Sequence, residues 1–281
     1  MQKNIALICN PTRQGSKSWG IGKKISSILT QTDTEHTLYI SGWPNGWQAF
    51  SEVWIIGGDG TLNYFINQNP DLDIPISIFA GGTGNDFHWM LYGKISIEQQ
   101  VKKLLKHNIQ KIDAGNCNGK LFLNGVGIGF DGAVVKDLLG KKKLVGKIVY
   151  YATILKNILG YRENQFSIAF ENTVIEKKCF LISIANGIRY GGGFKVAPKA
   201  LLNDGLLDLN MVYAISPLKR IRYLPVIETG KHLDLPFIDY RQIKKVQITT
   251  PISVDAHIDG EYFSASSFEI NCLPQKFSFL V

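Results

Sequence analysis

The sequence predicts an α/β domain with a parallel sheet, followed by a mainly antiparallel β domain. In residues 1–115, short apolar runs that suit strands alternate with segments of helical spacing, and this alternation is typical of a parallel sheet. From about residue 116, runs in which apolar and polar residues alternate dominate, and these indicate antiparallel strands. The length of 281 residues agrees with about two domains.

The first domain is predicted to contain strands separated by helices. The expected strands are residues 5–9, 38–40, 53–56 and 76–80. The expected helices are residues 19–29, 62–67 and 97–105, where apolar side chains recur at intervals of three and four. Ligands of such sheets bind at the carboxyl ends of the strands, so the loops that follow each strand are the candidates for function.

The second domain is predicted to be mostly strands, with one clear helix. The expected strands are residues 121–130, 166–170, 174–185, 207–213, 246–249 and 268–271. The helix is expected at residues 144–159, because Leu144, Ile148, Tyr151, Leu155 and Ile158 step by four and three.

Composition limits the partners and the compartment. The net charge of +8 and the pI of about 9.2 allow a nucleic acid, an anionic membrane or a phosphorylated substrate. No nucleic-acid-binding motif occurs, so we expect no nucleic acid partner. The apolar run 5–9 is too short for a signal peptide, and no run is long enough to span a bilayer. Four scattered cysteines are expected to be buried thiols, which indicates a reducing cytoplasm.

Two glycine-rich turns follow predicted strands. Residues 57–61, Gly-Gly-Asp-Gly-Thr, come after strand 53–56, and residues 81–86, Gly-Gly-Thr-Gly-Asn-Asp, come after strand 76–80. A strand, a glycine turn and a helix start together aim backbone N–H groups at a phosphate. Glycine is expected there for unusual φ values and close backbone approach. Asp59 then points to a divalent cation beside the phosphate, or it caps a turn; residues 81–86 are equally a capped helix start.

The order of motifs along the chain resembles the bacterial lipid kinase family, which includes soluble diacylglycerol kinases and is related to sphingosine kinases. The motifs are residues 57–63, 81–87, 186–187 with 191–194, 197–200, 203–208 and 259–261. The stretch 197–208 is the most specific, because the glycine-rich turn alone also occurs in NAD kinases and phosphofructokinases.

The resemblance implies a fold, an activity and cofactors. It implies a three-layer nucleotide-binding domain over residues 1–115 and a β-sandwich lipid-substrate domain over residues 116–281, whose last strand can return to the first domain. It also implies an ATP- and Mg²⁺-dependent transfer of the γ-phosphate to a lipid hydroxyl, on diacylglycerol or a related lipid at an anionic membrane surface. The protein would be cytoplasmic and would attach peripherally at the inner membrane face, and a homodimer stays open.

The resemblance also implies roles for individual residues. ATP would contact Asn10, Pro11, Thr12, Gly15, Ser41, Gly57, Gly58, Asp59, Gly60, Thr61, Asn63 and Thr83, with Glu261 beside the nucleotide. Asp59 and Asp86 would lie near a catalytic Mg²⁺, and Asp204 with the carbonyls of Leu201 and Leu206 would hold a structural Mg²⁺. Asp259 would be the general base that accepts the proton of the attacking hydroxyl; from the residues alone, residues 259–260 are equally a hairpin turn.

Two features leave alternatives open. Tyr64 stands where relatives usually carry an acidic residue, so a nucleotide-binding protein without turnover is one alternative, and an NAD kinase-like phosphotransferase is another. The basic stretch 136–162 includes Lys141, Lys142, Lys143 and Lys147 among tyrosines. It predicts salt-sensitive binding to anionic vesicles through residues 141–147, or else a core helix beside solvated lysines.

Overall fold

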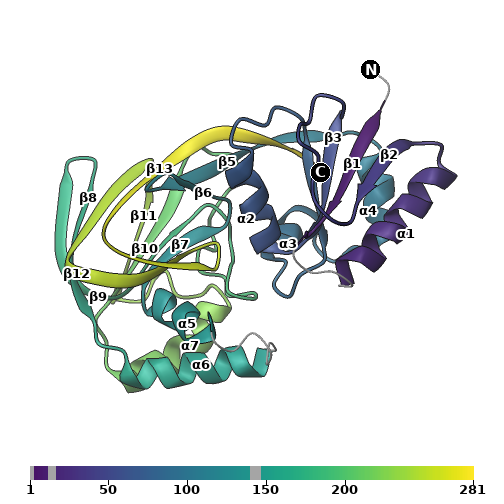
Figure 1. Cartoon of the computed structure of the whole chain (residues 1–281). Helices are drawn as coiled ribbons and strands as arrows, with labels where there is room; N and C mark the ends of the chain where they lie inside the picture. The colour runs from purple at the N-terminus through teal and green to yellow at the C-terminus, as the bar shows by residue number, and fades with distance from the viewer. Residues whose placement is uncertain (1–2, 12–16, 140–146) are drawn as a thin grey trace. The chain divides into compact units, whose positions relative to one another are not determined.

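The chain folds into two compact units. The computed structural model describes residues 3–11, 17–139 and 147–281 (Figure 1). Unit 1 comprises Met1–Ile112 together with Gln275–Val281, and unit 2 comprises Asp113–Pro274. The chain therefore enters unit 2 once, and its last residues belong to unit 1.

A parallel sheet forms the centre of unit 1. Its strands are β1 (Asn4–Cys9), β2 (Glu35–Tyr39), β3 (Glu52–Gly57) and β4 (Ile76–Ala80), in the order β2-β1-β3-β4. The end of β13 (Glu261–Leu280) pairs in parallel with β4, where Phe279 meets Ile76. Every residue of β3 is buried, which explains its unbroken apolar run at positions 53–56.

Four helices pack on this sheet as two pairs. The helices α1 (Lys17–Gln31) and α4 (Ile97–Leu104) contact each other, as do α2 (Asp59–Gln68) and α3 (Asp86–Tyr92). A capping box starts α4, where the Ser96 side chain accepts from the Gln99 amide and the Gln99 side chain accepts from the Ser96 amide. The helices predicted at 19–29, 62–67 and 97–105 are confirmed, and the three-layer arrangement stays a prediction.

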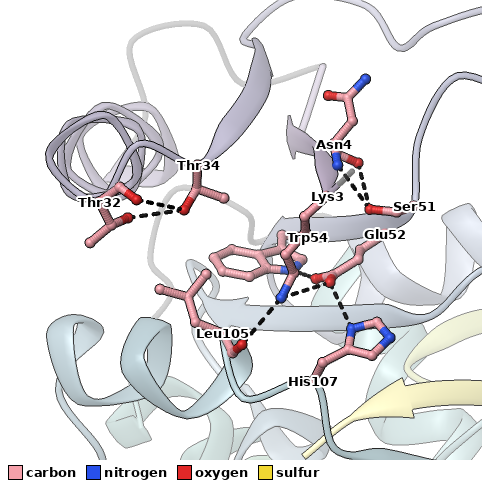
Figure 2. A network of polar contacts seen from close by, with 9 residues as sticks. All are labelled: Lys3, Asn4, Thr32, Thr34, Ser51, Glu52, Trp54, Leu105 and His107. Atoms are coloured by element: carbon pink, nitrogen blue, oxygen red, sulfur yellow. Dashed lines mark hydrogen bonds and ion pairs between the residues drawn. The ribbon is translucent and has the colours of Figure 1, made fainter. Parts of the chain in front are cut away.

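A buried carboxylate anchors the amino end of β3. Glu52 is fully buried, and its Oε1 lies 3.0 Å from Lys3 Nζ and 2.9 Å from His107 Nδ1. Its Oε2 accepts a hydrogen bond of 2.7 Å from Trp54 Nε1, and Lys3 also reaches the Leu105 carbonyl (Figure 2). The network ties β1, β3 and the loop after α4 together at the amino ends of the strands, whereas the glycine turns lie at the carboxyl ends.

Antiparallel strands make up most of unit 2. They are β5 (Ile109–Cys117, which begins in unit 1), β6 (Lys120–Phe122), β7 (Gly125–Gly129), β8 (Asn164–Phe170), β9 (Thr173–Ala185), β10 (Leu207–Tyr213), β11 (Ile238–Ile243) and β12 (Lys245–Ile258), with most of β13. Neighbours run β11-β10-β9-β7-β12-β13, and β8 pairs with both β9 and β12. The strands predicted at 166–170, 174–185 and 207–213 are confirmed.

In the described part of unit 2, three helices lie beside these strands. They are α5 (Phe130–Leu138), α6 (Lys147–Gly160) and α7 (Pro217–Glu228), and they gather on one side of unit 2 (Figure 1). The helix predicted at 144–159 is confirmed as α6 from residue 147 onward, residues 144–146 lie outside the described residues, and α5 and α7 were not predicted. Proline at positions 217 and 225 hid α7, although Pro217 starts the helix and Pro225 is tolerated inside it. The predicted strand 121–130 is instead β6, β7 and the start of α5.

Within the described residues, no helix has the length and apolarity needed to cross a membrane.

The four cysteines are free thiols, and three of them are buried. Burial raises the pKa of the Cys9 thiol to about 11 and that of the Cys117 thiol to about 12.

Candidate active site

The two glycine turns of unit 1 touch backbone to backbone. The Gly81 amide donates to the Gly57 carbonyl over 2.8 Å. A Cβ at Gly82 would lie 2.5 Å from the Gly58 Cα, and one at Gly57 would lie 2.5 Å from the Thr61 side chain. None of these glycines has a positive φ, so the prediction of unusual φ values was wrong. Glycine is required because the two turns approach each other more closely than any side chain allows.

Asp59 couples the first turn to the second. Its Oδ2 accepts from the Asp86 amide over 3.0 Å, and its Oδ1 accepts from the Phe87 amide over 2.9 Å. These two amides belong to the first turn of α3, so the carboxylate sits at the positive end of that helix. Asp59 therefore caps α3, a neighbouring element, and each of its oxygens keeps lone-pair capacity for a further partner.

Asn85 shapes the second turn, and Gly84 leaves a space beside two carboxylates. Asn85 adopts a left-handed φ of 54°, and its side chain exchanges two hydrogen bonds of 2.9 Å with the backbone of Gly82. A Cβ at Gly84 would lie 3.0 Å from Asp59 Oδ2 and 3.6 Å from Asp86 Oδ2. Both carboxylates thus converge on the space that a side chain would fill. Carboxylate oxygens are the ligands that Mg²⁺ prefers, so these residues fit the predicted ion.

Of the other residues predicted to bind ATP, Asn10 contacts the first glycine turn, and two lie outside the described residues. Asn10 follows β1, and its Nδ2 donates to Thr61 Oγ1 over 2.9 Å. Ser41 and Thr83 are exposed, whereas Asn63 is buried in α2. Pro11 and Gly60 complete the described members of the set, with Gly60 exposed in the first turn of α2. Thr12 and Gly15 lie outside the described residues.

Tyr64, which stands where relatives usually carry an acidic residue, and the buried His88 both make packing contacts. The Tyr64 ring lies 5.3 Å from the Trp43 ring, and its side chain is half exposed. His88 is buried, and its Nε2 lies 3.0 Å from Gln100 Oε1. Because Gln100 donates its own N–H to the Ile78 carbonyl, His88 Nε2 is the donor in this pair. Burial lowers the pKa of His88, whereas the hydrogen bond to Gln100 and the charge of Asp59 act in the opposite direction.

Asp259 of unit 2 sits in a hairpin turn and binds backbone amides. Residues 259 and 260 connect β12 to β13, and both have positive φ values, 47° and 86°. The Asp259 carboxylate accepts from the amides of Leu123, Asn124 and Gly125 over 2.9–3.0 Å. The hairpin turn predicted from the residues alone is therefore present. In addition, the Asp259 carboxylate holds the loop before β7 through three charge-assisted hydrogen bonds. Glu261 follows the turn and is exposed.

The loop that carries Asp204 wraps around a buried carboxylate. Asp204 Oδ1 accepts from the Leu206 amide over 3.0 Å, and Gly205 has a φ of 74°. The Asp113 amide donates to the Leu202 carbonyl over 2.7 Å, and Asp113 Oδ2 accepts from the Gly205 amide over 2.6 Å. The described residues contain no cluster of three or more His, Cys, Asp or Glu side chains suited to a metal.

That loop still offers the donor types of the predicted structural Mg²⁺, which are one carboxylate and two carbonyls, at Asp204, Leu201 and Leu206. Sequence reasoning missed Asp113, which is fully buried and organises the loop. The signal was an acidic residue between Ile112 and Ala114-Gly115, at the point where the pattern changes.

Unit 2 also contains a narrow apolar cavity that the sequence did not reveal. Its volume is about 60 Å³, and it lies between β9, β10 and the helices α5, α6 and α7. Its lining is mainly aliphatic and aromatic, including Val134, Ile154, Ile158, Phe180, Phe194, Val212 and Leu224. The residues come from five elements, so only the fold brings them together.

One end of this cavity is polar. Asp131 and Tyr190 belong to its lining, and Tyr190 Oη donates to Asp131 Oδ2 over 2.8 Å. His257 Nε2 lies 3.9 Å from the same oxygen, next to Gly127, where a Cβ would come within 2.5 Å of it. Burial and the charge of Asp131 raise the pKa of Tyr190, so its hydroxyl stays a donor. The sequence did contain a signal for this polar contact. The strand before Phe130-Asp131 is rich in glycine, which leaves room for the side chains of Asp131, Tyr190 and His257.

Two family models match the chain. The diacylglycerol kinase catalytic domain matches residues 4–117, and the YegS C-terminal NAD kinase beta sandwich-like domain matches residues 124–281, more than half of the chain. The chain belongs to the diacylglycerol and YegS-type lipid kinase family. This confirms the family that the motifs predicted, and it confirms a second domain of the β-sandwich type.

Known relatives of this lipid kinase family member agree with the match. A diacylglycerol kinase of Bacillus subtilis (strain 168) is 27% identical over 221 residues, which cover 76% of this chain and 72% of that protein. A crystal structure of a diacylglycerol kinase from Bacillus anthracis str. Sterne has a TM-score of 0.74 at 24% identity, covering 99% of this chain and 96% of the other.

An NAD kinase from Archaeoglobus fulgidus, solved in complex with ATP, has a TM-score of 0.58 at 14% identity and covers 99% of this chain and 93% of its own. At these identities the two structures show that the fold is shared, and nothing more.

Proposed function

We propose that this lipid kinase family member transfers the γ-phosphate of ATP, with Mg²⁺, to the hydroxyl of diacylglycerol or a related lipid. The observation that supports this most is the pair of glycine turns in backbone contact, with Asp59 and Asp86 converging on Gly84. Both turns lie at the carboxyl ends of parallel strands, where nucleotides bind in such sheets. The names of the curated relatives agree with a lipid acceptor.

Residues of unit 1 would bind the nucleotide, and residues of unit 2 would bind the lipid. In unit 1, the exposed amides at the start of α2 and Thr83 would receive the phosphates, and Asn10 would position Thr61. Bound Mg²⁺ would neutralise phosphate charge beside Asp59 and Asp86. In unit 2, Asp131 with Tyr190 would bind the polar end of the lipid, and the apolar cavity beside them would have to widen to take an acyl chain, because its volume of about 60 Å³ is well below the roughly 300 Å³ of ordinary ligand sites. Asp259 would accept the proton of the attacking hydroxyl.

The test is transfer of labelled γ-phosphate to a panel of membrane lipids and to NAD, with Mg²⁺ and after its removal by EDTA. We expect label in diacylglycerol or a related lipid, lost with EDTA and restored by Mg²⁺. Label in NAD alone would favour the NAD kinase-like alternative, which the shared fold keeps in view. ATP binding without transfer to any acceptor would favour a nucleotide-binding protein without turnover.

Asp259→Asn tests the general base, with a control for its structural role. An Asn side chain cannot accept at both ends, so one of the three amides near residue 124 loses its partner, at about 1–3 kcal/mol of stability. Unfolding of the variant must therefore be measured beside its activity. Asp255→Asn, in the same strand and paired with Lys136, is the matched control and should keep full activity. Full activity of a folded Asp259→Asn would rule out the base.

A further inference from the structure

The outer faces of α6 and α7 carry large apolar side chains that are exposed in the described part of unit 2. Leu159 is 64% exposed and Leu155, one turn earlier, is 44% exposed. In α7, Leu218 is 79% exposed and Ile221, three residues later, is 38% exposed. Single exposed leucines are ordinary, but a group of four on two adjacent helices marks an interaction surface.

These four residues, the α6–α7 apolar face, lie on neighbouring turns of the two helices. A surface hollow of about 690 Å³ is lined by Leu159 from α6 and by Pro217 from the first turn of α7, next to Leu218. Arg220 closes the base of this hollow, because its guanidinium binds the carbonyls of Ile158 and Tyr161 over 2.9 Å and pairs with Glu163. The two helix ends are thus held together.

The unpaired charges that the structure describes beside the α6–α7 apolar face are basic. In the basic stretch 136–162, the side chains of Lys141, Lys142, Lys143 and Lys147 lie outside the described part of the chain, and Lys156 pairs with Asp137. Residues 214–227 contain three basic residues and no acidic one, and Glu163, the acidic residue that lines the hollow, pairs with Arg220. Arg162, Lys219 and Arg222 are exposed, whereas Arg220 is buried and occupied by Glu163. Basic side chains beside exposed leucines fit a surface that is apolar within and anionic at its boundary, which is a lipid bilayer with acidic headgroups.

We propose that the α6–α7 apolar face docks on an anionic membrane, with Leu155, Leu159, Leu218 and Ile221 entering the acyl boundary and Arg162, Lys219 and Arg222 contacting lipid phosphates. The opposite faces of the same helices line the apolar cavity, through Ile154 and Ile158 of α6 and Leu224 and Ile227 of α7. Docking there places the cavity one helix layer from the bilayer. The purpose of docking rests on the proposed function, whereas the docking itself does not.

The experiment is sedimentation of the full chain with vesicles of phosphatidylcholine alone or with one quarter phosphatidylglycerol. Wild type should bind the anionic vesicles and lose binding at high salt. Leu159→Ser/Leu218→Ser should lower the apparent vesicle affinity at least about tenfold, because partial burial of two leucines is lost. Val174→Ser/Ile252→Ser is the matched control, since these strand residues are 65% and 62% exposed, and it should bind as wild type does. Thermal unfolding checks that both variants fold.

Three results would overturn the proposal. One is wild-type affinity of Leu159→Ser/Leu218→Ser for anionic vesicles, and another is no vesicle binding by wild type. The third is a wild-type dimer in sedimentation velocity that the double variant converts to a monomer with vesicle binding unchanged, which would assign the face to a second copy of the chain. Phosphate transfer to a short-chain diacylglycerol dispersed in water separates the docking proposal from the proposed kinase function, because it tests the kinase without a membrane. The rate of transfer should be equal in wild type and in Leu159→Ser/Leu218→Ser.

Discussion

Glycine and aspartate at a few positions determine the geometry of the candidate nucleotide site. The backbones of residues 57–58 and 81–82 touch, and Asp59 then fixes the start of the next helix through two amides. The same carboxylate is thus a structural cap and a candidate neighbour of a metal ion. Asp59 is an anion in a turn that would itself bind a phosphate anion. Its charge is stabilised there because α3 offers the carboxylate two N–H donors.

Gly82→Ala should destabilise unit 1 and weaken ATP binding. The new Cβ would lie 2.5 Å from the Gly58 Cα, a backbone atom that cannot rotate away. We therefore expect the free energy of unfolding to fall by about 1–3 kcal/mol. Gly20→Ala is the control, because a Cβ at that helix position meets nothing within 4 Å and should add about 0.5–1 kcal/mol. Tryptophan fluorescence during urea unfolding measures the free energy of unfolding of both variants. Equal stability of Gly82→Ala and wild type would refute the close contact of the turns.

His232 should make unit 2 sensitive to acid. It is buried with its Nε2 3.1 Å from the Val196 carbonyl, and burial lowers its pKa from the usual 6.5. The unfolded chain therefore binds this proton more readily, so the stability contributed is present above pH about 6.5 and is lost as the pH falls. His232→Gln keeps an N–H donor but does not titrate. The decline of unfolding free energy below neutral pH, followed by circular dichroism, should be shallower in the variant; identical declines would contradict this.

At the scale of secondary-structure elements, the helices of unit 2 have two working faces. The inner faces of α5, α6 and α7 close the apolar cavity against β9 and β10, and the outer faces of α6 and α7 expose leucines. This explains why α6 is apolar nearly all round, with Ile154 buried and Leu155 exposed beside it. A helix that only packed on a sheet would carry polar residues on its outer side.

Leu224→Phe should narrow the cavity and select against long lipids. Leu224 lines the cavity from α7, and a larger ring there hinders the widening that acyl chains would require. We expect KM for a long-chain diacylglycerol to rise several-fold more than KM for a short-chain one, with KM for ATP unchanged. Leu224→Met, which conserves volume, should behave as wild type. An equal effect on both lipids would mean that the acyl chains bind elsewhere.

At the scale of the whole molecule, the periodic parts of the chain were predictable and the assembled parts were not. Strand 76–80 and helix 97–105 follow from local patterns, because one buried face imposes its own period. The cavity and the Asp131–Tyr190 contact depend on elements far apart in sequence, so no local pattern contains them. Helix α7 was missed because its prolines usually end helices. The glycine turns were located correctly, but their physical reason, contact with each other, needed the structure.

The composition of unit 1 leads to the last prediction, because this unit is completed by the end of the chain. Phe277, Phe279 and Leu280 are at most 1% exposed, Phe279 pairs beside β4, and Tyr92 Oη donates to the Leu280 carbonyl. Burying three such side chains contributes about 5–9 kcal/mol, which is comparable to the whole stability of a domain. Deleting residues 276–281 should therefore unfold unit 1 at room temperature and leave unit 2 folded.

The protein contains its own probe for this experiment. All five tryptophans, at positions 19, 43, 47, 54 and 89, lie in unit 1, so their fluorescence reports on that unit alone. Circular dichroism follows the secondary structure of both units and therefore reports on unit 2 once unit 1 is unfolded. The truncated chain should show the emission of exposed tryptophan without denaturant and keep a cooperative transition by circular dichroism. Deleting Val281 alone removes one bond to Asn108 and should cost only about 0.5–1.5 kcal/mol. Native fluorescence in the longer truncation would show that the first 112 residues suffice to fold unit 1, and the final segment would then be an addition to a domain already stable without it.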